Sequence, residues 1–255
     1  MIDLHCHILP DMDDGPTTME QSIAMAEEAV AEGIQTIVAT PHHLTINYRN
    51  EKPAIARAVH ELNEVLKQRD LPLLVVPGQE IHINGEIAEQ YELGLIQTIN
   101  ETQKYILLEF PSNHVPRYTP ALLYDLLLKG LIPIIVHPER NSEIAEHPNI
   151  LYDLVLKGAL VQVTASSMTG GFGKTIKKLS LQLIEHNLVH FVASDAHNST
   201  NRPFNLRECY DTIEHELGMD IAVLFKKNAY AVIAGHVVSK FEPEEIRNKK
   251  IFGIF

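Results

Sequence analysis

The first fifteen residues contain the closest group of side chains that could bind a metal ion. His5 and His7 are two residues apart in an apolar, β-prone stretch, so a strand would place both imidazoles on one face. Pro10 ends this predicted strand, and the acidic pair Asp13 and Asp14 follows in a turn. Two imidazoles and a nearby carboxylate are the beginning of a divalent-metal site.

Further histidines and carboxylates follow other apolar segments, at the point where each predicted strand ends. The complete set of candidate ligands is His5, His7, Asp14, His42, Glu80, Glu109, His137, Asp195 and His197. Buried charges at the ends of apolar strands are costly unless they are paired or bind metal, so this set predicts more than one cation. Mixed nitrogen and oxygen ligation suits Mn, Fe or Zn better than Ca or Cu.

Two arginines are placed where they could recognise an anion beside these ligands. Arg140 lies three residues after His137, and Arg202 lies five residues after His197. A guanidinium group matches phosphate in a bidentate arrangement, so arginine next to metals indicates a phosphate site. The alternative for each arginine is a surface ion pair, for Arg140 with its neighbour Glu139.

Cysteine-based catalysis is disfavoured by the sequence. A cysteine phosphatase needs an arginine six residues after its thiolate, whereas Met12 and His215 occupy these positions after Cys6 and Cys209. Two cysteines are also too few for a disulfide framework.

Composition narrows the partners and the location that we expect. With 21 Lys and Arg against 33 Asp and Glu, the formal net charge is −12, which disfavours binding to nucleic acid or to an anionic membrane. The N-terminus has neither the basic nor the apolar region of a signal peptide, and no apolar run approaches the roughly 20 residues of a membrane span. We therefore expect a cytoplasmic protein without membrane insertion.

Apolar strands and helices alternate along the chain and would position the candidate ligands. After the first strand, the predicted strands are residues 34–40, 73–81, 105–110, 132–136, 159–164 and 189–193. The predicted helices are residues 17–33, 52–69, 85–94, 121–129, 142–157, 174–186 and 206–234. Seven strand-helix units with nearly continuous apolar strands indicate a parallel sheet covered by helices.

We expect these units to form a (β/α)7 barrel, with a doubly wound open sheet as the alternative. Six of the seven predicted strands end in His, Asp or Glu. An open sheet would gather ligands mainly at its switch point, whereas a barrel brings the carboxyl end of every strand to one mouth. No linker, repeat or low-complexity segment divides the chain, so we expect a single domain over residues 1–255 with a loose tail from about residue 240.

The motifs resemble those of the PHP (polymerase and histidinol phosphatase) superfamily, and within it the bacterial tyrosine-protein phosphatases of capsule and exopolysaccharide operons in Gram-positive organisms. The resemblance extends over nearly the whole chain. It rests on His5-Cys6-His7-Ile8-Leu9-Pro10 with Asp13-Asp14-Gly15, Thr40-Pro41-His42-His43, Gly78-Gln79-Glu80, His137-Pro138-Glu139-Arg140 and Ser194-Asp195-Ala196-His197-Asn198. Histidinol phosphatases typically carry Thr or Ser soon after the second histidine, where this chain has Ile8-Leu9-Pro10.

The resemblance implies a distorted TIM-like barrel with three divalent metal ions, expected to be Mn with Fe or Zn as alternatives. It implies that His5, His7, Glu80 and Asp195 bind one ion, that Glu80, Glu109 and His137 bind the second, and that Asp14, His42 and His197 bind the third. Asp13 remains the alternative to Asp14. Arg140 and Arg202 match the phosphate-binding arginines of the family.

The implied function is hydrolysis of phosphotyrosine on a protein by metal-activated water, in the regulation of capsule and exopolysaccharide synthesis. The implied partner is a cognate bacterial tyrosine kinase with a tyrosine-rich tail. One alternative is another phosphoesterase of the superfamily, acting on histidinol phosphate or a nucleic acid 3′ end, which the net charge and the first motif disfavour. The other is a metal-stabilised adaptor without turnover, although a structural metal site needs no anion-binding arginines.

Overall fold

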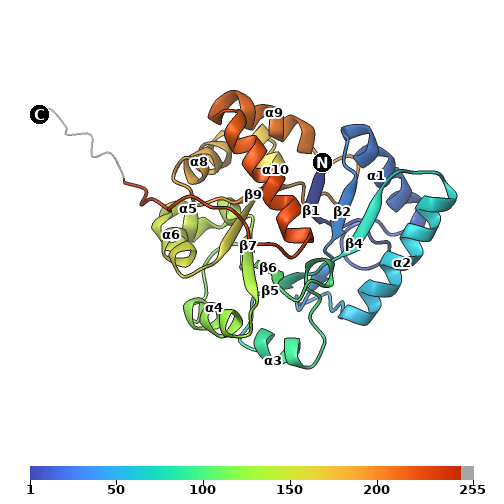
Figure 1. Cartoon of the computed structure of the whole chain (residues 1–255), viewed down its shortest axis with the longest axis horizontal. Coiled ribbons are helices and arrows are strands. Elements are labelled where there is room, and N and C mark those ends of the chain that lie inside the picture. Colours follow the sequence, from blue (N-terminus) through green and yellow to red (C-terminus); the bar gives the residue numbers. More distant parts are fainter. Residues whose placement is uncertain (248–255) are drawn as a thin grey trace, which may run out of the picture.

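Nine strands alternate with helices along residues 1–247, the part of the chain that the computed structural model describes (Figure 1). The strands are β1 (Ile2–Cys6), β2 (Thr36–Ala39), β3 (His42–His43), β4 (Leu74–Pro77), β5 (Glu80–His82), β6 (Tyr105–Glu109), β7 (Ile132–Val136), β8 (Leu160–Thr164) and β9 (Phe191–Ala193). The helices are α1 (Met19–Glu32), α2 (Lys52–Gln68), α3 (Ile87–Glu92), α4 (Thr119–Leu128), α5 (Ser142–Glu146), α6 (Asn149–Leu156), α7 (Ala165–Thr169), α8 (Lys174–Glu185), α9 (Leu206–Leu217) and α10 (Met219–Ile233), with short 3-10 turns η1 (Ile99–Glu101) and η2 (Pro138–Arg140).

The strands form two parallel sheets, in the orders β1-β2-β4 and β3-β5-β6-β7-β8-β9. The predicted strand 73–81 is interrupted and becomes β4 and β5, whereas the predicted strand 34–40 is β2 and is followed by the separate short strand β3. Pro41, between β2 and β3, has no N–H to donate to a sheet. Gly78, between β4 and β5, lies where a Cβ would be 2.5 Å from Val38 Cγ1. The structure therefore shows the predicted parallel α/β architecture, whereas the pairing into two sheets does not confirm a closed seven-stranded barrel.

Backbone hydrogen bonds connect β1 with the segment that follows β9. The N–H of Asp195 donates to the carbonyl of His5 at 2.8 Å, and the N–H of His7 donates to the carbonyl of Ala196 at 2.9 Å. Cys6 and Ala196 form an isolated parallel bridge between these segments. The N-terminal histidines and residues 194–197 are thus brought together, although nearly 190 positions separate them in the sequence.

Two of the predicted helices are divided by residues that a helix interior disfavours. The predicted helix 142–157 is α5 and α6, which end and begin on either side of His147 and Pro148. The predicted helix 206–234 is α9 and α10, separated by Gly218, whose φ of +95° is outside the helical region. None of the helices within residues 1–247 combines the length and the apolarity needed to cross a membrane.

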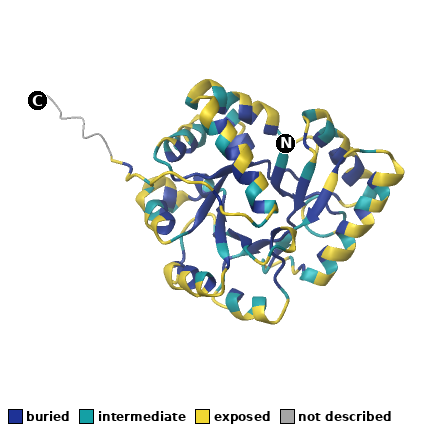
Figure 2. Cartoon of the chain, viewed as in Figure 1, coloured by how far each residue is buried: buried dark blue, intermediate teal, exposed yellow. Residues whose placement is uncertain are grey.

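The strands are largely buried, and the helices around them expose one face to solvent (Figure 2). Helix α2 shows why one face of a helix is buried. Its buried residues recur every three or four positions and therefore lie on one side, namely Ile55, Val59, Leu62 and Leu66. Burying such a stripe against the sheet stabilises the fold by about 25 cal/mol per Å² of apolar surface. The same packing holds the carboxyl ends of the strands, and their polar side chains, in fixed positions.

The prediction of a loose tail from about residue 240 is corrected for residues 240–247. Asn149 and Ile246 exchange two hydrogen bonds, with Nδ2 donating to the Ile246 carbonyl at 3.2 Å and the Ile246 N–H donating to Oδ1 at 2.8 Å. The Glu244 N–H also donates to the carbonyl of His186 at 2.9 Å. These bonds and the buried Ile246 side chain fix the stretch to the fold. The rest of the predicted tail, residues 248–255, lies outside the described residues.

Candidate metal centre

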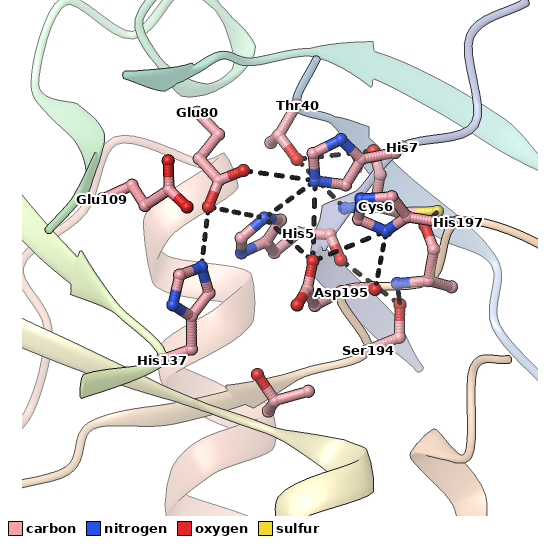
Figure 3. Close-up of polar contacts among 12 residues, drawn as sticks. His5, Cys6, His7, Thr40, Glu80, Glu109, His137, Ser194, Asp195 and His197 are labelled. Carbon is pink, nitrogen blue, oxygen red and sulfur yellow. Dashed lines mark hydrogen bonds and ion pairs between the residues drawn. The ribbon is translucent and has the colours of Figure 1, made fainter. Parts of the chain in front are cut away.

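The predicted ligands lie together at the carboxyl ends of the strands, where Glu80 contacts His5, His7 and His137 (Figure 3) and also His42. Its Oε1 is 2.8 Å from His137 Nε2 and 3.4 Å from His5 Nε2. Its Oε2 is 2.8 Å from His42 Nδ1 and 3.3 Å from His7 Nε2. One carboxylate therefore faces four imidazoles from three different segments of the chain.

Potential ligand atoms form three groups, each with all of its atoms within 4.8 Å of one another. The groups are His5, His7 and Glu80, then His42, Glu80 and Glu109, and finally His7, Asp14, His42 and His197. Two more predicted ligands lie beside these groups. His137 contacts Glu80 as above, and Asp195 Oδ1 is 3.5 Å from the Nε2 atoms of both His5 and His7. All nine predicted side chains are thus neighbours in one cluster.

Asp13 and Asp14, which the sequence left as alternatives, have different positions. Asp14 Oδ1 is 3.2 Å from His197 Nε2 and 3.4 Å from His42 Nε2, inside the cluster. Asp13 lies behind His7, where its Oδ2 accepts a hydrogen bond from His7 Nδ1 at 2.6 Å. Its Oδ1 accepts from the N–H of Gly15 at 2.9 Å. The geometry favours Asp14 as the ligand and gives Asp13 an outer role.

The two histidines of β1 are each oriented from outside the cluster. Gln162 Oε1 accepts from His5 Nδ1 at 3.0 Å, as Asp13 accepts from His7 Nδ1. With both Nδ1 atoms donating, a neutral imidazole keeps its lone pair on Nε2. These two Nε2 atoms lie only 3.2 Å apart and both face the cluster. Sequence analysis missed Gln162, for which the only available signal was a buried amide within the apolar strand β8.

The polar atoms of the cluster fit divalent metal ions. Three buried atoms of the cluster, His42 Nδ1, Glu80 Oε2 and His197 Nε2, lie at ion-pair distance from a neighbour but form no well-oriented hydrogen bond within residues 1–247. Unpaired buried donors or acceptors are costly, and a bound cation would satisfy them. The mixture of imidazole and carboxylate ligands is the type that Mn, Fe and Zn accept.

Electrostatics keep the two most buried carboxylates of the cluster charged. Burial opposes ionisation of Glu80, but His5 and His42 hold the pKa of this carboxyl well below its usual range. Burial likewise opposes ionisation of Asp195, but Arg140 and then His5 hold its pKa well below its usual range. Burial and the positive charge of a neighbouring imidazole lower the pKa of His197 to about 4, which leaves it neutral and able to bind a cation at neutral pH.

Backbone strain accompanies the ligands at the ends of β7 and β9. His137 and Asp195 have φ angles of +36° and +55°, in the left-handed region that residues other than glycine rarely adopt. Such strain persists only where surrounding contacts fix it, and it concentrates at functional sites. His137 is the first residue after β7 and Asp195 the second after β9, so the strained conformation turns each side chain toward the cluster.

The two predicted arginines converge on one carboxylate of the cluster. Arg140 Nη2 donates to Asp195 Oδ2 at 2.7 Å, and Arg202 Nη2 donates to both oxygens of Asp195 at 3.0 Å. Arg202 Nη1 is also 3.4 Å from Asp14 Oδ2. The alternative of a surface pair between Arg140 and Glu139 is wrong, because the buried Glu139 instead accepts from the Thr164 N–H and the Ser167 hydroxyl.

A cavity of about 280 Å³ opens beside the cluster and could hold a phosphoester. Arg140, Arg202 and Glu109 contribute to its charged side, whereas Phe110 and Pro111 contribute apolar surface. An anion bound there would contact both arginines while an attached apolar group contacted Phe110.

Both cysteines are unsuited to act as nucleophiles. Cys6 and Cys209 are fully buried, and burial raises the pKa of each thiol above its usual value. This agrees with the prediction that the chemistry of the site does not depend on a thiolate.

Comparison with known proteins identifies the family. The sequence matches the family described as "Capsular polysaccharide synthesis, CpsB/CapC" over residues 1–234. The chain belongs to the CpsB/CapC family. The tyrosine-protein phosphatase YwqE of Bacillus subtilis is 49% identical over 255 residues, which cover 100% of both chains. The putative tyrosine-protein phosphatase CapC of Staphylococcus aureus is 42% identical, again over 100% of both.

The structure agrees with the family assignment. It matches a crystal structure reported for YwqE from Bacillus subtilis and CpsB from Streptococcus pneumoniae, "unique metal-dependent tyrosine phosphatases", with a TM-score of 0.95 and 48% identity, over 97% of this chain and 100% of that chain. A probable 2-pyrone-4,6-dicarboxylic acid hydrolase of Acinetobacter baumannii, 14% identical, matches with a TM-score of 0.52 over 91% and 98%, which shows similarity of fold alone. Membership in CpsB/CapC confirms the predicted relationship to capsule-type tyrosine-protein phosphatases.

Proposed function

We propose that this member of the CpsB/CapC family is a metal-dependent protein-tyrosine phosphatase. The observation that carries the proposal is the meeting of nine imidazole and carboxylate side chains with two arginines at one cavity. The relatives named tyrosine-protein phosphatases, which align over the full length of the chain, support the choice of substrate.

We infer three divalent ions, with Mn as the expected metal and Fe or Zn as alternatives. The proposed ligand sets are His5, His7, Glu80 and Asp195, then Glu80, Glu109 and His137, and finally Asp14, His42 and His197. When bound, such ions hold phosphoryl oxygens and lower the pKa of the water that attacks phosphorus. Glu80 would be shared between two sets, which agrees with its contacts to four imidazoles.

The residues of the chain would bind and orient the phosphoester. Arg140 and Arg202 would donate to the equatorial oxygens, where negative charge develops in the transition state. Asp195 holds both guanidinium groups beside the cavity before the substrate arrives. A phenolate leaving group has a pKa of about 10 and departs more readily than an alkoxide, so the reaction depends less on a strong general acid.

A barrel would explain why ligands from distant segments meet. One cluster of buried apolar residues receives side chains from both sheets, namely Leu4, Val38, Val76, Leu107, Val136, Leu160 and Phe191. We therefore infer that the two sheets surround a shared interior as parts of a distorted (β/α)7 barrel. The whole chain would then be a single domain with its metal centre at one mouth.

The proposed physiological substrate is a phosphotyrosine protein, such as a cognate bacterial tyrosine kinase and its targets, in the cytoplasm. The family description, capsular polysaccharide synthesis, supports a role in that process. The net charge of −12 continues to disfavour nucleic acid as a substrate.

Kinetics on four substrates at one Mn concentration test the proposal. We expect kcat/KM for phosphotyrosine peptides to exceed that for phosphoserine peptides and histidinol phosphate at least about tenfold, and single-stranded DNA to remain intact. Equal or faster turnover of histidinol phosphate, or loss of DNA ends, would contradict the substrate class. Absence of turnover of p-nitrophenyl phosphate by the metal-loaded protein would instead support an adaptor without catalysis.

A further inference from the structure

Asn50 connects two segments of the metal centre without belonging to any group of potential ligands. Its side-chain amide donates to the carbonyl of Met12 at 2.7 Å and to the carbonyl of His42 at 2.9 Å. Met12 directly precedes the acidic turn with Asp13 and Asp14. One buried amide group thus links the turn to the short strand β3, which carries His42.

Asp13 makes a second connection between the same two segments. Its Oδ2 accepts from the backbone N–H of His42 at 2.9 Å and from His7 Nδ1 at 2.6 Å. Both polar backbone groups of His42 are therefore held by side chains, the N–H group by Asp13 of the acidic turn and the carbonyl group by Asn50, which is itself bonded to that turn.

A further amide holds Asn50 itself in place. Gln79 Nε2 donates to the carbonyl of Asn50 at 2.6 Å, and Gln79 Oε1 accepts from the N–H of Gln97 at 3.0 Å. Gln79 is fully buried and directly precedes Glu80. The hydrogen-bond network therefore extends from the acidic turn through β3 to the start of β5.

We propose that Asn50 and Asp13 are positioning residues that set the place of the ligand group His7, Asp14, His42 and His197. This inference rests on the proposed metal-dependent function, because it concerns the geometry that an ion needs. Hydrogen-bond partners behind metal ligands orient those ligands, and their loss typically weakens metal binding about 10- to 100-fold. Of the other two groups, the one formed by His5, His7 and Glu80 lacks His42 and lies outside the direct contacts of Asn50.

Replacing Asn50 by aspartate tests the proposal with almost no change of shape. Asn50→Asp removes the N–H donors and places a carboxylate oxygen against two carbonyl oxygens. We expect Mn binding at the site formed by His7, Asp14, His42 and His197 to weaken about tenfold or more, with loss of about one equivalent at a concentration that fills the wild type. Equilibrium dialysis with elemental analysis measures this directly, without reference to turnover.

Asn228 offers a matched control away from the metal centre. Its Nδ2 donates to the carbonyls of His190 and Ser239 at 3.0 and 2.9 Å, in the same manner as Asn50. Asn228→Asp should lower the Tm of the protein, because the variant loses two hydrogen bonds from a side-chain amide to backbone carbonyls, as Asn50→Asp does. It should leave the number of bound Mn ions and their affinity unchanged.

Asp13→Asn provides a second variant that decides the question if Asn50→Asp does not fold. His7 Nδ1, the His42 N–H and the Gly15 N–H all donate to Asp13, so an amide NH₂ in its place opposes a donor in either orientation. We expect weaker Mn binding in this variant too. Wild-type metal content and affinity in a folded variant would overturn the role of the residue replaced. If the wild type binds the ions but hydrolyses no phosphotyrosine, the proposed function fails while the positioning roles stand.

Discussion

Buried histidines occur in two contrasting environments in this protein. In the cluster, burial lowers the pKa of His5, but the charges of Glu80 and Asp195 outweigh burial and raise it. At the other site, burial and then Lys240 lower the pKa of His190 to about 3, and His190 Nδ1 accepts a hydrogen bond from the Val161 N–H. The same type of side chain is therefore a neutral structural acceptor in one place and part of a candidate metal-binding cluster in the other.

Both histidines are buried, so burial does not distinguish a candidate metal ligand from a structural histidine. The presence of neighbouring carboxylates does. His190 accepts one hydrogen bond from the backbone of β8, and no carboxylate among the described residues contributes to the shift of its pKa. The cluster gathers carboxylates whose negative charges require cations. Four measurements test this contrast.

Metal removal should have the largest effect. A strong chelator should reduce phosphatase activity to background, because the residues of the chain alone do not supply an activated water, and added Mn should restore it. Cys6→Ser and Cys209→Ser should retain activity, since neither buried thiol contributes to the chemistry. Loss of turnover in Cys209→Ser, with a native circular dichroism spectrum, would refute the metal-dependent mechanism.

Glu80→Gln should disable the centre while keeping the shape of the side chain. Glu80 faces four imidazoles, so loss of its charge should release more than one ion and lower kcat roughly 10³-fold or more. Elemental analysis and phosphotyrosine peptide kinetics measure both effects. Glu32→Gln is the control, because Glu32 accepts from the N–H groups of Asn205 and Leu206 away from the cluster. Equal metal content in Glu80→Gln and the wild type would remove Glu80 from the ligand set.

Arg140→Ala should separate phosphate binding from metal binding. The guanidinium contacts Asp195 at the cavity, so its removal should lower kcat about 10²-fold while the metal content is unchanged. Arg207→Ala, which removes an arginine bonded to the carbonyl of Ala31, should show wild-type kinetics. Near wild-type kcat and KM in Arg140→Ala would leave Arg140 with a structural role only.

His190→Asn should have the smallest effect and should act on stability alone. The folded-state pKa of His190, about 3, lies below the usual 6.5, so the unfolded chain binds the extra proton and stability falls as the pH drops below 6.5. This residue should contribute a loss of about 1 kcal/mol between pH 6.5 and 5.5. The asparagine oxygen can accept the hydrogen bond from the Val161 N–H, and asparagine does not titrate. The variant should therefore lack the loss of stability that protonation of His190 causes.

Urea denaturation of His190→Asn and the wild type at several pH values measures the difference, in which the contributions of other titrating groups cancel. Identical pH dependence in the two proteins would show that His190 is not held neutral. Phosphatase activity should be the same in both at neutral pH, because His190 does not contact the cluster.

Local patterns in the sequence were enough to predict the candidate ligands and the parallel architecture. The spacing of His5 and His7 fixes their common face, and apolar strands that end in polar residues predict where the site forms. The break between β4 and β5 and the two divided helices coincide with residues that disfavour regular structure, Gly78, Pro148 and Gly218, although the sequence analysis predicts each of these segments as continuous.

The roles of the outer residues could not be predicted, because each depends on a partner far away in the sequence. Gln162 meets His5 across 157 positions, and Asn50 meets Met12 across 38. No periodicity marks such residues, since a buried amide looks the same in the sequence whether it orients a ligand or caps a turn.

The choice between Asp13 and Asp14 separates what the sequence predicts from what only the tertiary structure determines. The sequence by itself determined that an acidic turn follows the histidines of β1. Only the packed structure decided which carboxylate enters the cluster, because Asp13 is held behind His7 by donors from His7, Gly15 and β3. Adjacent residues of the same type differ in function because each hydrogen bond is short-ranged, and the partners within reach are set by the register of distant segments.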